Sequence, residues 1–100
     1  MGETVKLTEE QIRDGLTRLD GWELDPEGPV LRRTLRLVGF PEAVSLVNTV
    51  AQAAEQAGHH PDIDIRYDTV HLALATHSEG AVTEKDMALA ARIDELVPQG

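Results

Sequence analysis

The histidines are the side chains of this sequence that are best suited to proton-transfer chemistry. All four lie between residues 59 and 77 of the 100-residue chain, as His59, His60, His71 and His77. Because the ordinary pKa of histidine lies nearest to neutrality, an imidazole can donate or accept a proton at physiological pH. His59 and His60 stand next to Pro61, and His77 follows a segment of alternating apolar residues. These three histidines are therefore candidates for general acid/base catalysis.

Other interpretations of these polar residues were weighed. Adjacent histidines cannot easily point at one ion, and the helical and finger spacings of zinc sites are absent, so we expect no metal site. His71 lies about 20 Å from His77 along an extended strand, and we interpret it as a surface residue. Asp86 follows Thr83 with near capping-box spacing, which by itself accounts for a carboxylate at that position.

Three segments have the apolar spacing of helices that could position these residues. Thr8 and Gln11 have capping-box spacing at the start of the first segment. Gly58 is a natural stop for the second, and Pro98 for the third. The predicted helices span residues 8–19, 40–57 and 83–96.

Four further segments alternate with a period of two, which indicates half-buried strands. In one of them Tyr67 shares a predicted face with Ile63 and Ile65. The tight Asp68-Thr69 connection predicts an antiparallel hairpin. The predicted strands span residues 22–24, 30–38, 62–67 and 69–76.

Two hairpins with one apolar face each predict an α+β fold: a four-stranded antiparallel sheet with three helices packed on one face, in the order α-β-β-α-β-β-α. In the second hairpin, the start of one strand and the end of the other are neighbours. We therefore expect His60 and His77 to meet at one edge of the sheet, close to the end of the long helix.

Length and charge exclude several classes of protein. A chain of 100 residues is expected to form a single domain over residues 1–100. A net charge of −9 disfavours binding to nucleic acid or to an anionic membrane surface. The absence of cysteine removes disulfides and thiolate chemistry, and a cytoplasmic location is the default expectation.

The spacing of the site residues resembles a known signature. The string His59-His60-Pro61, five residues, Tyr67, two residues, Val70, five residues, Thr76-His77 is similar to that of the pterin-4a-carbinolamine dehydratases. The resemblance extends over about residues 7 to 97, and Thr83-Glu84-Lys85-Asp86 is similar to the start of that family's last helix. The family fold has helices on one side of a four-stranded antiparallel sheet, which agrees with the element order.

The resemblance implies removal of water from 4a-hydroxytetrahydropterin to give quinonoid dihydropterin, a step in tetrahydrobiopterin recycling. No cofactor is implied, because the pterin is the substrate. The resemblance makes His59, His60, His77 and Asp86 the catalytic residues. Its substrate-binding residues are His59, His60, Pro61, Thr76 and His77, with His60 and His77 as the acid/base pair and Asp86 orienting an imidazole.

The resemblance also implies partners and leaves alternatives open. The expected partners are a small-molecule pterin and further copies of the chain, in a homodimer or homotetramer. One alternative function is a non-catalytic dimerisation or binding role, since some family members are partners of a transcription factor. Another is binding or dehydration of a different pterin, such as one of molybdopterin metabolism.

Overall fold

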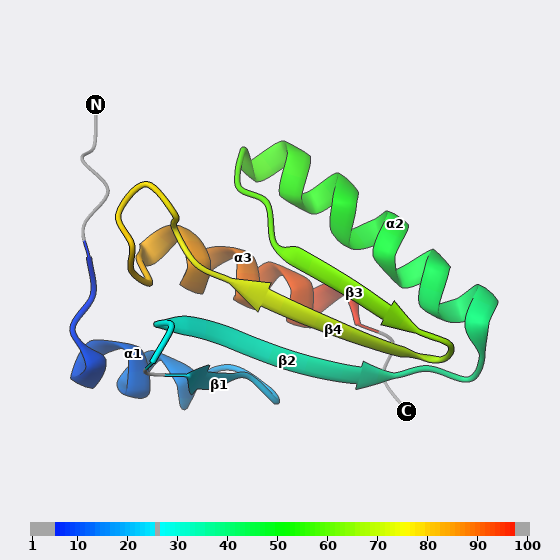
Figure 1. Ribbon diagram of the computed structural model, residues 1–100, viewed down its shortest axis with the longest axis horizontal. Coiled ribbons are helices and arrows are strands. Elements are labelled where there is room, and N and C mark those ends of the chain that lie inside the picture. The colour runs from blue at the N-terminus through cyan, green and yellow to red at the C-terminus, as the bar shows by residue number, and fades with distance from the viewer. Residues whose placement is uncertain (1–5, 26, 98–100) are drawn as a thin grey trace.

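A four-stranded antiparallel sheet with three helices on one face forms this protein, described by a computed structural model over residues 6–25 and 27–97 (Figure 1). The predicted α+β class and element order are confirmed. The elements are α1 (Glu9–Leu16), β1 (Glu23–Asp25), β2 (Val30–Arg36), α2 (Phe40–Ala57), β3 (Asp62–Arg66), β4 (Thr69–Leu74) and α3 (Glu84–Leu96). Within the described ranges, no helix is long and apolar enough to cross a membrane.

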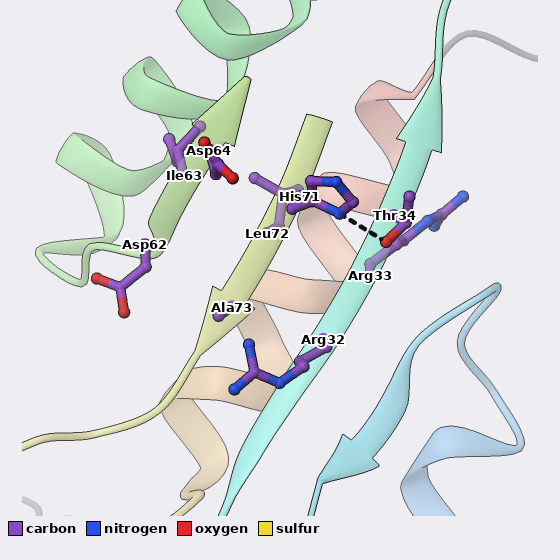
Figure 2. A pocket seen from close by; sticks show the side chains of 9 residues that line it. All are labelled: Arg32, Arg33, Thr34, Asp62, Ile63, Asp64, His71, Leu72 and Ala73. Atoms are coloured by element: carbon purple, nitrogen blue, oxygen red, sulfur yellow. Dashed lines mark hydrogen bonds between the residues drawn. The ribbon is translucent and has the colours of Figure 1, made fainter. Parts of the chain in front are cut away.

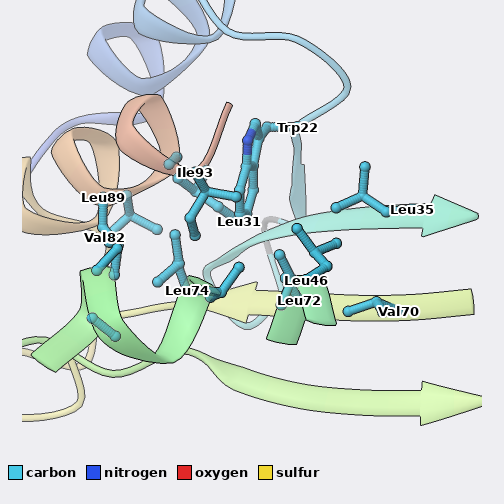
Figure 3. Close-up of a cluster of buried hydrophobic side chains, with 14 of the residues drawn as sticks. Trp22, Leu31, Leu35, Leu46, Val70, Leu72, Leu74, Val82, Leu89 and Ile93 are labelled. Carbon is cyan, nitrogen blue, oxygen red and sulfur yellow. The ribbon is translucent and has the colours of Figure 1, made fainter. Parts of the chain in front are cut away.

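The sheet has the strand order β1-β2-β4-β3, so β4 lies between β2 and β3. Its alternating residues divide the sheet into a covered and an open face. Leu31 pairs with Leu74, and Leu35 pairs with Val70, and all four are buried beneath the helices. Figure 3 shows how these side chains meet those of the helices, with the labelled core residues Trp22, Leu31, Leu35, Leu46, Val70, Leu72, Leu74, Val82, Leu89 and Ile93.

One charged cluster interrupts the covered face. Arg33 shares the inward parity of Leu31 and Leu35, and its guanidinium forms an ion pair with Asp94 of α3. Asp94 also accepts hydrogen bonds from Trp22 Nε1 and from the backbone N–H of Asp20, each at 2.8 Å. The side chains of Arg33 and Asp94 are 9% and 17% exposed. This cluster ties the last helix to the first hairpin.

The helix ends explain how the chain enters and leaves the site region. In α1 the predicted Thr8 capping box is confirmed, but the helix ends at Leu16 rather than near Leu19. The N–H groups of residues 17 to 19 donate to carbonyls three residues earlier, so the last turn tightens. The predicted bounds of α2 are confirmed, and Gly58 caps it with a left-handed φ of 64°. Pro98 lies outside the described residues.

Three predicted strands are shorter than expected. Thr76 is not in β4, because its backbone pairs with Ala81 across a tight turn instead of with the sheet. The strand predicted over residues 30–38 ends at Arg36, where Leu37 donates a hydrogen bond to the Asp68 carbonyl. The predicted inward placement of Tyr67 is wrong: it occupies the β3–β4 turn with a φ of 56°, and it is 70% exposed.

Candidate active site

The pairing of β3 with β4 determines where the candidate residues lie. Asp62, at the start of β3, is opposite Ala73, near the end of β4. The segment His59-His60-Pro61 therefore leads into the sheet at the end where Thr76-His77 leaves it. The start of α3 joins them there, since Thr76 is held to Ala81 only two residues before the Thr83 helix cap. The α2–β3 connection and the β4–α3 connection thus meet at one end of the sheet.

His59 forms the closest side-chain contact of this region. Gly58 reverses the chain at the end of α2, and the backbone N–H of His59 then donates to the Ala54 carbonyl. His59 Nε2 lies 2.5 Å from Oδ1 of Asp86, a hydrogen bond between residues 27 positions apart. The imidazole is 11% exposed, and the Asp86 carboxylate is completely buried. Among the candidate histidines, His59 is the imidazole that Asp86 contacts.

The second oxygen of Asp86 is held by the two threonines that flank the β4–α3 connection. Oδ2 accepts the Thr76 hydroxyl at 2.8 Å and the Thr83 backbone N–H at 2.9 Å. The two threonine hydroxyls are 2.7 Å apart, and all three residues are buried. The capping role predicted for Asp86 is confirmed, and the same carboxylate also contacts His59. Asp86 therefore caps α3 and contacts an imidazole at the same time.

His60 points away from this buried cluster. Its Nε2 lies 2.6 Å from Glu55 Oε1 on the last turns of α2, and both side chains are mostly exposed. This hydrogen bond tilts the imidazole toward the helix rather than toward His59. A pair this exposed contributes about 0–1 kcal/mol to stability, so His60 is free to rotate toward a ligand at little cost.

His77 lines a hollow on the open face of the sheet. The hollow has a volume of about 270 Å³, with Ala73 and Ala75 as its small-residue floor and Arg32 and Asp62 at its sides. Thr76 and Pro29 also line it. Small side chains on the floor leave room for a flat ligand next to the His77 imidazole.

His59 lines a different cavity, of about 360 Å³, between α2 and α3. Ala53, Ala57 and Leu89 supply apolar walls there, and Lys85 and Arg92 supply positive charge. No carboxylate lines this cavity in the described structure, although the chain as a whole has a net charge of −9. His59 and His77 therefore line two different hollows, and these side-chain positions do not bring the two imidazoles into one pocket.

His71 lies outside the site, on the open face of β4. Its Nδ1 is 3.0 Å from the Thr34 hydroxyl of β2, as Figure 2 shows, and Asp64 of β3 lies opposite it in register. His71 is exposed. The hollow drawn in Figure 2 shares Arg32, Asp62 and Ala73 with the one that His77 lines, so the two hollows adjoin on the open face of the sheet.

Comparison with models of protein families identifies the family of this chain. The family model described as pterin 4 alpha carbinolamine dehydratase matches residues 5–96. The chain belongs to this family. Proteins named for the pterin-4-alpha-carbinolamine dehydratases support the assignment: one from Chloroflexus aggregans is 50% identical over 93% of this chain and 98% of its own length. One from Nocardia farcinica is 50% identical over 93% of this chain and 96% of its own.

Solved structures of pterin dehydratase relatives share the fold. The crystal structure of a transcriptional coactivator/pterin dehydratase from Brucella melitensis is 32% identical, with a TM-score of 0.89 over 94% of this chain and 100% of that chain. A pterin dehydratase-like protein identified as a RuBisCO assembly factor in the alpha-carboxysome is 23% identical, with a TM-score of 0.67 over 81% and 94% of the two chains. The second likeness concerns the fold alone.

Sequence reasoning missed two partners in this dehydratase-family site. Glu55, in the last turns of α2, contacts His60, and the sequence analysis assigned it no partner. Thr83 was interpreted only as a helix cap, whereas its hydroxyl also reaches Thr76. Spacing along the chain does not reveal a hydrogen bond between residues 76 and 83, because it depends on the tight turn between them.

Proposed function

We propose that this protein dehydrates 4a-hydroxytetrahydropterin to quinonoid dihydropterin by general acid/base catalysis. The observation that carries the proposal is the largely buried His59–Asp86 hydrogen bond, which joins two residues inside the segment matched by the dehydratase family model. A histidine held by a buried carboxylate has a defined orientation and proton position, which a purely scaffolding protein does not require.

The reaction needs two proton transfers and no change of oxidation state. An acid protonates the hydroxyl on C4a, which leaves as water when the C–O bond breaks. The N5 lone pair forms the new C4a=N5 double bond, and a base removes the N5 proton. Groups that titrate near neutrality suit both transfers, and each transfer typically contributes a factor of about 10²–10⁴ in rate.

Our assignment makes His60 and His77 the acid/base pair near C4a and N5. His59, oriented by Asp86, contacts the pterin or its hydroxyl. The pterin would lie over the Ala73 and Ala75 floor, since that hollow opens beside His77. His59 lines the neighbouring cavity between α2 and α3, so its ring would turn toward the bound pterin. His60 reaches the ligand by exchanging its exposed contact with Glu55 for one with the substrate.

Stopped-flow ultraviolet spectroscopy of carbinolamine decay tests this assignment. We expect His60→Ala and His77→Ala each to lower turnover by about 10²-fold or more, the loss expected for a general acid or base. His71→Ala is the matched control, because it removes an imidazole from the same sheet outside the site. Turnover of the His60 and His77 variants within about threefold of the parent would refute their roles.

A binding role is the second candidate function. The Brucella melitensis relative is described as a transcriptional coactivator as well as a pterin dehydratase. If this chain acts only by binding, the folded parent protein will not accelerate carbinolamine decay, and His77→Ala will leave its partner affinity unchanged.

A further inference from the structure

We infer that Thr76 and Thr83 are positioning residues: through Asp86 they fix the His59 proton on Nε2 and leave Nδ1 as the nitrogen that can accept a hydrogen bond from a ligand. This inference rests on the proposed function, and it adds the device that sets the protonation pattern of the site. It is carried by a closed set of hydrogen bonds among buried groups.

The direction of each hydrogen bond follows from counting protons. The Lys85 backbone N–H can only donate, so Thr83 Oγ1 accepts it, at 3.2 Å. The Thr76 hydroxyl donates its single proton to Asp86 Oδ2. The contact between the two hydroxyls must then run from Thr83 to Thr76. Every hydroxyl proton in the network is used, and the chain of donors ends on Asp86.

An ionised carboxylate has no proton to donate, so Asp86 accepts at both oxygens. Oδ2 receives two donors, the Thr76 hydroxyl and the Thr83 backbone N–H, and these hold the carboxylate in the plane that points Oδ1 at His59. Because Oδ1 accepts, the short contact of 2.5 Å is donated by His59, whose Nε2 must carry a proton.

The other nitrogen of His59 is the one open to a ligand. Throughout the described residues, every buried side-chain nitrogen and oxygen has a hydrogen-bond partner. No partner is found for His59 Nδ1 in the same part of the chain, so this atom is reached by solvent. His59 also lines the cavity between α2 and α3. In the neutral imidazole Nδ1 is then an unprotonated acceptor that faces the solvent side of the ring.

Substitution of Thr76 separates positioning from folding. Thr76→Val keeps the shape but removes the donor to Oδ2 and the acceptor for the Thr83 hydroxyl. Thr76→Ser keeps both functions. Thr34→Val is the matched control, since it removes a threonine hydroxyl that hydrogen-bonds His71 on the open face, away from Asp86. A variant that does not melt cooperatively is replaced by Thr76→Ala, which removes the hydroxyl without filling its space.

The first readout is the tautomer of His59, from long-range ¹H–¹⁵N spectra near pH 8.5, where an ordinary imidazole is about 99% neutral. Signals of His59 are identified by their loss in His59→Gln. We expect a protonated Nε2 in the parent, in Thr76→Ser and in Thr34→Val, and a mixture of tautomers in Thr76→Val. A parent-like tautomer in folded Thr76→Val would overturn the inference.

The second readout is carbinolamine turnover. Thr76→Val is expected to lower kcat by about tenfold or more with KM nearly unchanged, and Thr76→Ser to restore it, because the contact of His59 with the reacting ligand depends on the correct tautomer. A kcat in Thr76→Val equal to that of Thr76→Ser contradicts the positioning role. If the parent has no activity, the proposed function fails, and the tautomer measurement still decides the positioning by itself.

Discussion

Removal of the Asp94 carboxylate is predicted to destabilise the fold by more than any surface ion pair could. Asp94→Ala leaves the nearly buried guanidinium of Arg33 without its partner and also leaves Trp22 Nε1 without an acceptor. Breaking a buried pair by removing one partner costs about 3–5 kcal/mol. Because Asp94 keeps some contact with solvent, we expect about 3 kcal/mol, or a fall in Tm of at least about 12 °C.

The assay is urea unfolding followed by both circular dichroism and fluorescence. Trp22 is the only tryptophan, so its emission reports on the region of the cluster. Asp14→Ala is the matched control: it removes the partner of Arg18 from an ion pair in which both side chains are 71% exposed. That change should cost no more than about 1 kcal/mol.

A double variant tests the physical reason for the loss. If the cost of Asp94→Leu comes from an unpaired buried charge, Arg33→Met added to Asp94→Leu should recover part of the stability, since apolar replacements of buried pairs are often neutral. A loss below about 1 kcal/mol in Asp94→Ala would refute the reasoning. So would a double variant that is less stable than Asp94→Leu alone.

Two further predictions concern the turns that frame the sheet. Gly58→Ala should lower the free energy of unfolding by about 1 kcal/mol, because the φ of 64° at this position strains any residue that has a side chain. The strain is conformational, since a Cβ at this position meets open space. A free energy of unfolding in urea equal to that of the parent would contradict this prediction. The Thr69 hydroxyl and Arg36 lower the pKa of Asp68, and burial opposes them. A carboxyl group with a lowered pKa stabilises the fold above the pKa of the unfolded chain, and this stabilisation is lost as the pH falls through the folded pKa. Because Thr69→Val removes the largest cause, an NMR titration should show a higher Asp68 midpoint in this variant. An unchanged midpoint would exclude this cause.

The fold was predictable because its local patterns agree with one another. The bounds of α2 follow from apolar spacing, Pro41 and Gly58, and each of these signals depends on a few neighbouring residues. The pairing of the second hairpin follows from its alternation and tight turn. The prediction that Tyr67 faces inward was wrong because the alternation of a strand does not continue into a turn residue with positive φ.

The sequence named the residues of the candidate site, but it could not predict their contacts. Sequence spacing indicates that Asp86 caps α3, yet its second contact, to His59, depends on how Gly58 reverses the chain after α2. Sequence spacing also could not predict that His59 and His77 line separate hollows, because this depends on the directions in which the two side chains point. Arg33 lay on a predicted inward position, but Asp94 could be recognised as its partner only in three dimensions.

The most direct test of the account is multiple turnover of 4a-hydroxytetrahydropterin by the parent protein, followed by stopped-flow ultraviolet spectroscopy with the substrate in large excess. The account predicts that a catalytic amount of protein converts all the carbinolamine to quinonoid dihydropterin faster than the spontaneous reaction. Decay at the spontaneous rate in the presence of folded protein would contradict it.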